Sequence, residues 1–226
     1  MRLVRCLSLW GVLLLVGGAC GQGALPARDA STVKVTLERW RTAIQSNNGE
    51  MAYGLLDAKT IGFYEDCRKD ALAVKKADLA LRDYLTRLTI LWLRCEFTKA
   101  DLDKKSDKDV IVAGVKKGWI GGSFAGQIVV QYVGVDKDGM AYVTLRQSPK
   151  TPAFYFVKED ALWKLALSQT FELANKGFTQ LHAKSELSAE DFFVKLLEEG
   201  SRTRAKVDRK IFDGPLDELP KPPEKK

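Results

Sequence analysis

The sequence predicts an α+β domain in which N-terminal helices pack on a curved antiparallel meander sheet of about four strands, with a further helix at the C-terminal end. Apolar residues recur at helical spacing through the first half of the chain. Residues 124–174 are rich in Val, Tyr and Phe and are divided by polar turns, which is typical of strands. The 226 residues are 46% hydrophobic, enough for one core, and helices followed by strands is an α+β order. We therefore expect a single domain over residues 31–212.

The first expected helix has one continuous apolar face. Its residues are four, three and four positions apart: Val33, Leu37, Trp40 and Ile44. Ser31 or Thr32 can cap its start, and the polar run at 46–49 ends it. Further helical segments are expected at 51–56, 63–72 and 77–97, with one or two short charged helices in 98–122.

Four strands are expected to follow as a meander, in the segments 123–135, 139–148, 152–160 and 161–174. Their separators are short polar turns, among them 136–139 and 148–152. In the last segment the apolar residues hold one parity, with Gln169 as the exception: Trp163, Leu165, Leu167, Phe171 and Leu173. That alternation fits a strand with one buried face.

Two features end the domain. Residues 188–199 begin with Ser188 and Asp191 in positions that resemble a capping box and continue with apolar residues, which predicts a final helix. Residues 213–226 hold four of the seven prolines together with several lysines, so we expect an extended, disordered tail.

The N-terminus has the three parts of a secretory signal peptide. Arg2 and Arg5 precede an apolar stretch over residues 7–16, and small residues follow at 17–19. The apolar stretch is about half of the roughly 20 residues that a transmembrane helix needs, and glycines follow it. We therefore expect residues 1–19 to be removed after export, and the alternative is a retained membrane span.

The run Gly17-Gly18-Ala19-Cys20 resembles the lipobox of bacterial lipoproteins, in which small residues precede an acylated cysteine. The family usually has Leu at the position of Gly17. The resemblance implies that Cys20 becomes the lipidated N-terminus and that residues 20–30 form a tether. Acyl chains on Cys20 would then anchor the protein in the membrane of the bacterial cell envelope, on its periplasmic or outer surface, because two or more chains hold stably. The alternative is an ordinary signal peptide that ends near a cysteine.

Removal of Cys6 and lipidation of Cys20 leave two of the four cysteines, Cys67 and Cys95. Both lie at apolar positions of expected helices. An even pair in an oxidising compartment predicts a disulfide between them. The alternative is two buried free thiols, because cysteine also packs as a small hydrophobe.

The charge of the chain gives a weak indication about partners. The net charge of +7 falls to +5 on removal of residues 1–19, which contain two arginines and no acidic residue. Such an excess favours contact with anionic lipid or cell-wall polymer. The sequence has no dense basic stripe with interleaved aromatic residues, so nucleic acid is not an expected partner.

Two stretches resemble the nuclear-transport-factor-two-like superfamily, in which a curved sheet wraps helices into a cone. Residues 37–67 combine a helix, a polar break and a short second helix, and residues 141–169 form a strand pair that leads into Trp-Lys-Leu. The resemblance covers about residues 32–175 and implies a cone-like domain. The superfamily hosts both enzymes and binding modules. It also implies dimerisation through the exposed sheet face, so a homodimer is an expectation.

Catalytic members of that superfamily use an Asp base or a His–Asp pair. The one histidine here, His182, follows the strands in a polar stretch that is typical of surface residues. Glu172, or else a buried Asp, would serve an isomerase- or hydratase-like enzyme, whereas the alternative for Glu172 is a solvated face or an ion pair. The sequence has no nucleotide-binding glycine motif and no clustered metal ligands, so no cofactor and no metal are expected.

A pocket inside the cone, lined by aromatic residues and one polar contact, is the remaining expectation. Its expected members are Trp119, Tyr132, Tyr142, Arg146, Tyr155 and Trp163. The alternative for the aromatic residues is ordinary core packing. The sequence favours a membrane-anchored, non-catalytic envelope lipoprotein that binds a protein partner or a small-molecule ligand. The other interpretations are the isomerase- or hydratase-like enzyme and a structural module that contacts cell wall or anionic lipid.

Overall fold

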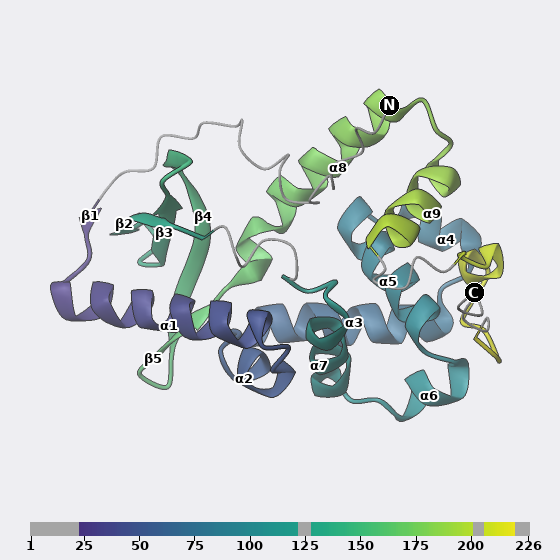
Figure 1. The fold of residues 1–226 in the computed structure, drawn as a ribbon, viewed down its shortest axis with the longest axis horizontal. Helices are drawn as coiled ribbons and strands as arrows, with labels where there is room; N and C mark the ends of the chain where they lie inside the picture. Colours follow the sequence, from purple (N-terminus) through teal and green to yellow (C-terminus); the bar gives the residue numbers. More distant parts are fainter. Residues whose placement is uncertain (1–22, 122–127, 201–205, 220–226) are drawn as a thin grey trace, which may run out of the picture.

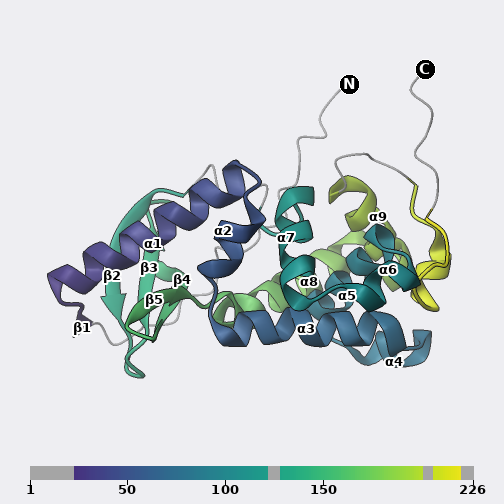
Figure 2. The same cartoon turned by 90° about the horizontal axis from the view of Figure 1, so that it is seen from below.

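The computed structural model describes residues 23–121, 128–200 and 206–219, and it is an α+β domain (Figure 1). Cys20 and the expected signal peptide lie outside the described residues. A five-stranded antiparallel sheet and α1 (Ala27–Gln45) occupy one end, and most other helices gather at the opposite end. Helices α3 (Ala58–Ala73) and α8 (Phe171–Ser185) start near the sheet and run into the helical end (Figure 2).

Strand β1 (Gly23–Ala24) and the start of α1 replace much of the expected tether. Helix α1 begins earlier than predicted because Pro26 precedes it with a φ of −50°, and the Pro26 carbonyl oxygen accepts from Ala30 N at 2.9 Å. The predicted apolar face is confirmed, since four residues of that face are buried: Val33, Leu37, Trp40 and Ile44.

Four helices lie in or beside the segments predicted for them: α2 (Gly49–Gly54), α3, α6 (Lys99–Lys104) and α7 (Asp107–Lys117). Each is preceded by a side chain that accepts a hydrogen bond from a backbone N–H three residues further on: Asn48, Asp57, Thr98 and Ser106. Such caps satisfy donors that a helix start leaves unpaired. Helix α7 ends where Gly118 adopts a φ of 85°, a conformation that favours glycine.

The long helix expected over residues 77–97 is divided in two. Helices α4 (Lys76–Leu81) and α5 (Tyr84–Glu96) are separated at Asp83, whose carboxylate accepts from the backbone N–H and the hydroxyl of Thr86, both at 2.9 Å. Because the Asp83 side chain caps the start of α5, a new helix begins there and the chain does not continue as one helix. Leu81, which belonged to the expected apolar face, is 85% exposed as a result.

The sheet is a meander in the order β1-β2-β3-β4-β5, and all neighbouring pairs are antiparallel. Its longer strands are β2 (Val130–Val135), β3 (Ala141–Leu145), β4 (Ser148–Glu159) and β5 (Leu162–Leu165). The segment 148–152, expected as a turn, begins β4. Its pairing with β3 is irregular where Pro152, which has no N–H, lies opposite Thr144. The described sheet has five strands rather than about four because β1 joins one edge.

The fourth expected strand is wrong beyond Leu165. The chain continues as a short 3-10 helix, η2 (Leu167–Thr170), and then as α8. The same stretch also has a helical apolar face, made by residues three and four apart: Phe171, Ala174 and Phe178. Tertiary packing selects the helix, since the Phe171 ring lies 4.4 Å from the ring of Phe63 on α3, between centroids.

The predicted final helix is confirmed as α9 (Ala189–Gly200). Asp191 N donates to Ser188 Oγ at 3.2 Å, as the capping pattern predicts, and that hydroxyl donates to the Asp191 carboxylate at 2.6 Å. A 3-10 helix, η3 (Arg209–Phe212), follows later. Residues 213–219, expected as part of a disordered tail, contact the helices instead, and the Leu216 carbonyl oxygen accepts from Lys99 N at 2.8 Å.

The sheet and the helices share one contiguous core. Leu165 on β5 donates to the Leu55 carbonyl oxygen at 2.8 Å and accepts from Asp57 N at 3.1 Å, so the α2–α3 connection covers that edge of the sheet. Within the described residues, no helix combines the length and the apolar character that crossing a membrane requires.

Candidate ligand-binding site

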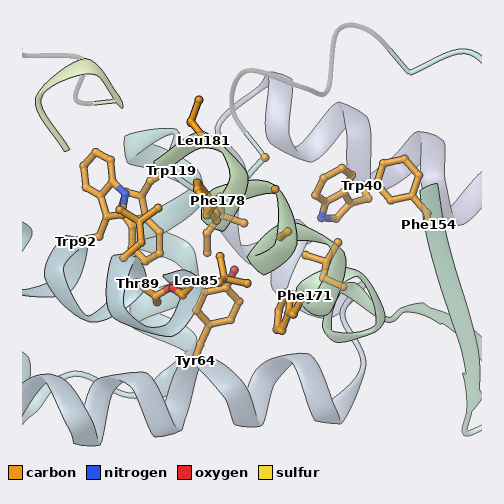
Figure 3. Close-up of a pocket in the computed structure, with 16 residues that line it drawn as sticks. Trp40, Tyr64, Leu85, Thr89, Trp92, Trp119, Phe154, Phe171, Phe178 and Leu181 are labelled. Atoms are coloured by element: carbon orange, nitrogen blue, oxygen red, sulfur yellow. The ribbon is translucent and has the colours of Figure 1, made fainter. Parts of the chain in front are cut away.

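A cavity of about 90 Å³ lies where one end of the sheet meets the helices (Figure 3). Residues of α1, α3, α5, β4, η2 and α8 line it, together with residues 119–121, which follow α7. Seven aromatic rings of the described residues stand in its wall: Trp40, Tyr64, Trp92, Trp119, Phe154, Phe171 and Phe178. None of the described residues that line the cavity carries a charge.

Helices α5 and α8 supply much of the wall, because each presents one face to it. Helix α5 contributes residues within two turns: Leu85, Leu88, Thr89 and Trp92. Helix α8 contributes residues over three turns: Phe171, Ala174, Gly177, Phe178 and Leu181. Spacings of three and four residues place these side chains on one side of each helix. The amphipathic pattern of both helices therefore positions the wall.

Ring contacts hold the aromatic wall in place. Trp92 of α5 and Trp119 are stacked, with centroids 6.2 Å apart and an interplanar angle of 9°. Tyr64 of α3 lies 6.3 Å from Trp119, and Trp40 of α1 meets Phe154 of β4 edge-on at 5.9 Å. Contacts of this geometry add to the stabilisation from burial. Rings from distant parts of the chain thus keep fixed positions around the space.

Gly121 allows the chain to pass close to this wall. Its φ is +73°, and a Cβ atom there would lie 3.1 Å from Cη2 of Trp40 and 3.2 Å from Ile44 side-chain carbons. A larger residue would be strained in this conformation and would press on Trp40. The glycine therefore sets how near this loop lies to α1.

Three hydrogen-bond donors belong to side chains of the cavity wall, and they differ in whether they face the space. The indole N–H groups of Trp40 and Trp119 are buried and have no partner in the described ranges. The Tyr64 hydroxyl points into the cavity (Figure 3). Burial raises the pKa of Tyr64 above its ordinary value of 10.0, so its hydroxyl is neutral and can donate. The Thr89 hydroxyl already donates to the Leu85 carbonyl oxygen at 2.9 Å.

Most residues of the pocket that the sequence predicts lie outside this cavity. Of the expected residues, Trp119 lines the cavity. The others do not line it: Tyr132, Tyr142, Arg146, Tyr155 and Trp163. Trp163 faces α1, where its indole N–H donates to Asp29 Oδ1 at 3.0 Å. The sheet contributes Phe154 to the wall, and helices supply most of the other rings.

Tyr64, Trp92 and Phe178 were not expected at a site. Their signal in the sequence is the apolar spacing of the helices that carry them, which indicates that they face inward. The positions of apolar residues along the chain do not indicate whether a cavity remains between the helices, because a cavity depends on how several elements pack.

Glu172 is not at the centre of a strand. It lies in the first turn of α8, its side chain is 81% exposed, and it pairs with Lys176 at 2.6 Å. This ion pair lowers the pKa of Glu172, chiefly through the hydrogen bond from Lys176. The alternative given above, an ion pair on a solvated face, is correct for this residue.

His182 is half-buried, in contrast to the expected surface residue. Its Nδ1 atom lies 2.6 Å from the Tyr84 hydroxyl oxygen, and its Nε2 atom lies 3.0 Å from the Leu187 carbonyl oxygen. Because a carbonyl oxygen only accepts, Nε2 carries a proton, and in the neutral ring Nδ1 accepts from Tyr84. These two hydrogen bonds join α5, through His182 of α8, to the connection between α8 and α9. His182 does not line the cavity.

The structure does not contain the predicted disulfide, because Cys67 and Cys95 are both free thiols. Arg94 on α5 faces α3, where its Nε atom donates to a carbonyl oxygen. Cys95 is the next residue and points about 100° further around the helix. Burial chiefly raises the pKa of Cys95, and the Glu96 and Asp208 carboxylates add to the shift. The alternative of two free thiols therefore fits the structure.

Within the described part of the chain, no group of three or more His, Cys, Asp or Glu side chains could hold a metal ion. No family model matches the chain, and comparisons with curated proteins and with solved structures give no match. The resemblance to the nuclear-transport-factor-two-like superfamily stays a prediction from the sequence.

Proposed function

We propose that the protein is a membrane-anchored envelope lipoprotein whose non-catalytic domain binds a small, mainly apolar molecule. The observation that carries the binding function is the uncharged cavity with its aromatic wall. Ligand sites in proteins are typically concave, mostly apolar and lined by a few placed polar groups. The cavity described above has each of these properties.

The size of the cavity supports a small ligand. Its volume of about 90 Å³ is several times the roughly 10–15 Å³ that one water molecule needs. Water inside it would meet mainly aromatic and aliphatic side chains and would make few hydrogen bonds. Displacement of such water by an apolar molecule is favourable.

We propose a modified form of the cone-like domain, in which a helix packs along the sheet and further helices complete the binding site. Helix α1 packs along the sheet, as a helix inside a cone would (Figure 2). The proposed binding site lies beyond the strands, where α3, α5 and α8 complete the wall. The helical end of the molecule is thus part of the binding domain.

A catalytic function has less support. Glu172 faces solvent. Asp57 is 3% exposed, but its carboxylate caps α3 by accepting from Thr60 N at 3.0 Å, and it does not line the cavity. Neither residue supplies an acid or a base next to a molecule bound there.

The membrane anchor is the second part of the proposal, and it rests on the lipobox-like run that ends at Cys20. Strand β1 begins at Gly23. A domain acylated at Cys20 would therefore lie close to the membrane surface, and an apolar molecule that partitions into the membrane would be near its binding site.

A cavity-filling substitution tests the binding function. Ala174→Leu adds volume inside the cavity, and Ala183→Leu makes the same change on the exposed side of α8. We expect toluene to raise the melting temperature of the wild type and of Ala183→Leu, because a ligand stabilises the state that it binds. Ala174→Leu should show little shift. Equal shifts in the two variants would place toluene outside the cavity and contradict the proposal.

A further inference from the structure

The polar groups around the cavity indicate which class of ligand it binds. The inference about that class rests on the proposed function. Among the described lining residues, the Tyr64 hydroxyl is the donor that faces the space (Figure 3), whereas the indole N–H groups of Trp40 and Trp119 are buried within the wall. The Thr89 hydroxyl is already engaged with a backbone carbonyl. No lining side chain in those ranges is a carboxylate, an amide or an ammonium group. A bound molecule therefore meets the Tyr64 hydroxyl and no charge.

Tyr64 is the donor best placed to reach such a molecule. Its hydroxyl extends from α3 into the space beside α5 and α8 (Figure 3). The residue is 7% exposed, so bulk water hardly competes for the hydroxyl. Contacts with Phe63, 5.3 Å between centroids, and with Trp119 hold the ring in this orientation. A donor fixed in advance loses little entropy when it binds an acceptor.

We propose that the ligand is a neutral compound with one ring and a hydrogen-bond acceptor, such as a carbonyl oxygen, that accepts from the Tyr64 hydroxyl. The aromatic wall favours a flat ring, which can make offset or edge contacts. A charged molecule would find no counter-ion among the described lining residues, and burial of an unpaired charge is costly. The cavity volume of about 90 Å³ favours a small compound.

Two probes of nearly equal shape test the need for an acceptor. Acetophenone has a carbonyl oxygen where α-methylstyrene has a methylene group. Titration of the full-length protein with each probe, followed by NMR, gives the ratio of the two dissociation constants. Tyr64→Phe removes the hydroxyl alone, and we expect it to reduce the preference for acetophenone about tenfold, which corresponds to one buried hydrogen bond.

Tyr53→Phe is the matched control, because it removes a hydroxyl outside the cavity that lies 3.5 Å from the Asp107 carboxylate. Its ratio should equal that of the wild type. Infrared spectroscopy of acetophenone bound to the wild type gives a readout that needs no variant. The carbonyl band should lie at lower frequency than in hexane, because a hydrogen bond weakens the C=O bond.

An unshifted carbonyl band, or the same ratio in the wild type and in Tyr64→Phe, would overturn this inference. Binding of both probes with toluene stabilisation intact would then leave the proposed function standing. If neither probe binds and toluene does not stabilise the wild type, the proposed function fails together with the inference.

Discussion

The Nε atom of Arg94 donates a hydrogen bond to the carbonyl oxygen of Ala71 at 2.8 Å. The Arg94 side chain is fully buried, although arginine is rarely buried without a paired charge. Its other nitrogen atoms donate to four more backbone carbonyl groups: Asp70, Val74, Ile211 and Phe212. One side chain on α5 thus joins the end of α3 to the C-terminal segment.

The charge of Arg94 is balanced by carbonyl dipoles. Several of its acceptors lie at the C-terminal end of α3, which carries the negative end of the helix dipole. Burial lowers the pKa of Arg94 to about 10, and the Asp213 and Asp70 carboxylates act in the opposite direction. The guanidinium group therefore stays charged at neutral pH.

Arg94→Met should loosen this junction. We expect the free energy of unfolding to fall by about 2–5 kcal/mol, because several buried carbonyl groups lose their donor. We also expect trypsin to cleave faster near η3. Urea denaturation and limited proteolysis measure the two effects. Arg39→Met, on the exposed side of α1, is the control, and an equal loss in both variants would contradict the role of Arg94.

Asp29 joins α1 to the sheet and should make stability depend on pH. Its carboxylate accepts from Trp163 Nε1 at 3.0 Å and from Lys158 Nζ at 3.2 Å. Both bonds, chiefly that of Trp163, lower the pKa of Asp29 below its ordinary value of 3.8. A carboxyl group with a lowered folded-state pKa stabilises the protein above its unfolded pKa, and this contribution is lost as the pH falls through the folded value.

We therefore expect the urea midpoint of the wild type to fall more than that of Asp29→Asn when the pH is lowered from about 6 to about 3. Asp138→Asn, at an exposed turn position, should behave as the wild type does. Parallel pH curves for the wild type and Asp29→Asn would show that the contact with Trp163 does not persist in solution.

Cys67 and Cys95 should react as buried thiols. Burial raises the pKa of both, that of Cys95 to about 12, so neither forms much thiolate at neutral pH. We expect slow alkylation of the folded protein and fast alkylation of both thiols in urea without reductant, counted by intact mass. If neither thiol is alkylated in urea until reductant is added, the disulfide predicted from the sequence forms.

Lipidation of Cys20 has a direct test in cells. We expect labelled palmitate to enter the wild-type protein and not Cys20→Ala, because the variant has no thiol at the proposed acylation site. The variant should also leave the membrane fraction. Cys67→Ala is the control and should keep the label. Equal labelling of Cys20→Ala and the wild type would contradict the anchor.

The predicted helix boundaries were most accurate where local signals agree. The face that contains Val33 and Trp40 and the cap formed by Ser188 follow from spacing and side-chain chemistry within a few residues. The spacing of apolar residues did not predict the break between α4 and α5 at Asp83, because the apolar pattern continues across that residue. An aspartate at a helix start is a signal that could have revealed the break.

The candidate site was predicted less well, and Trp119 is the expected member that lines the cavity. Tyr132, Tyr142 and Tyr155 were expected at the pocket as aromatic residues of the strands, whereas the sheet contributes Phe154. Which face of a strand turns towards a given space depends on the register and on the elements packed against the sheet.

By itself the sequence determined the class of the domain, the apolar faces of its main helices and the meander order of its strands. These properties depend on periodicity, caps and turns, which act within a few residues. The tertiary structure decided that Phe171 begins a helix, that Cys67 and Cys95 are free thiols, and that Tyr64 faces an open space. Each of these outcomes depends on contacts between residues far apart in the chain, and packing selects among local alternatives that the sequence leaves close in free energy.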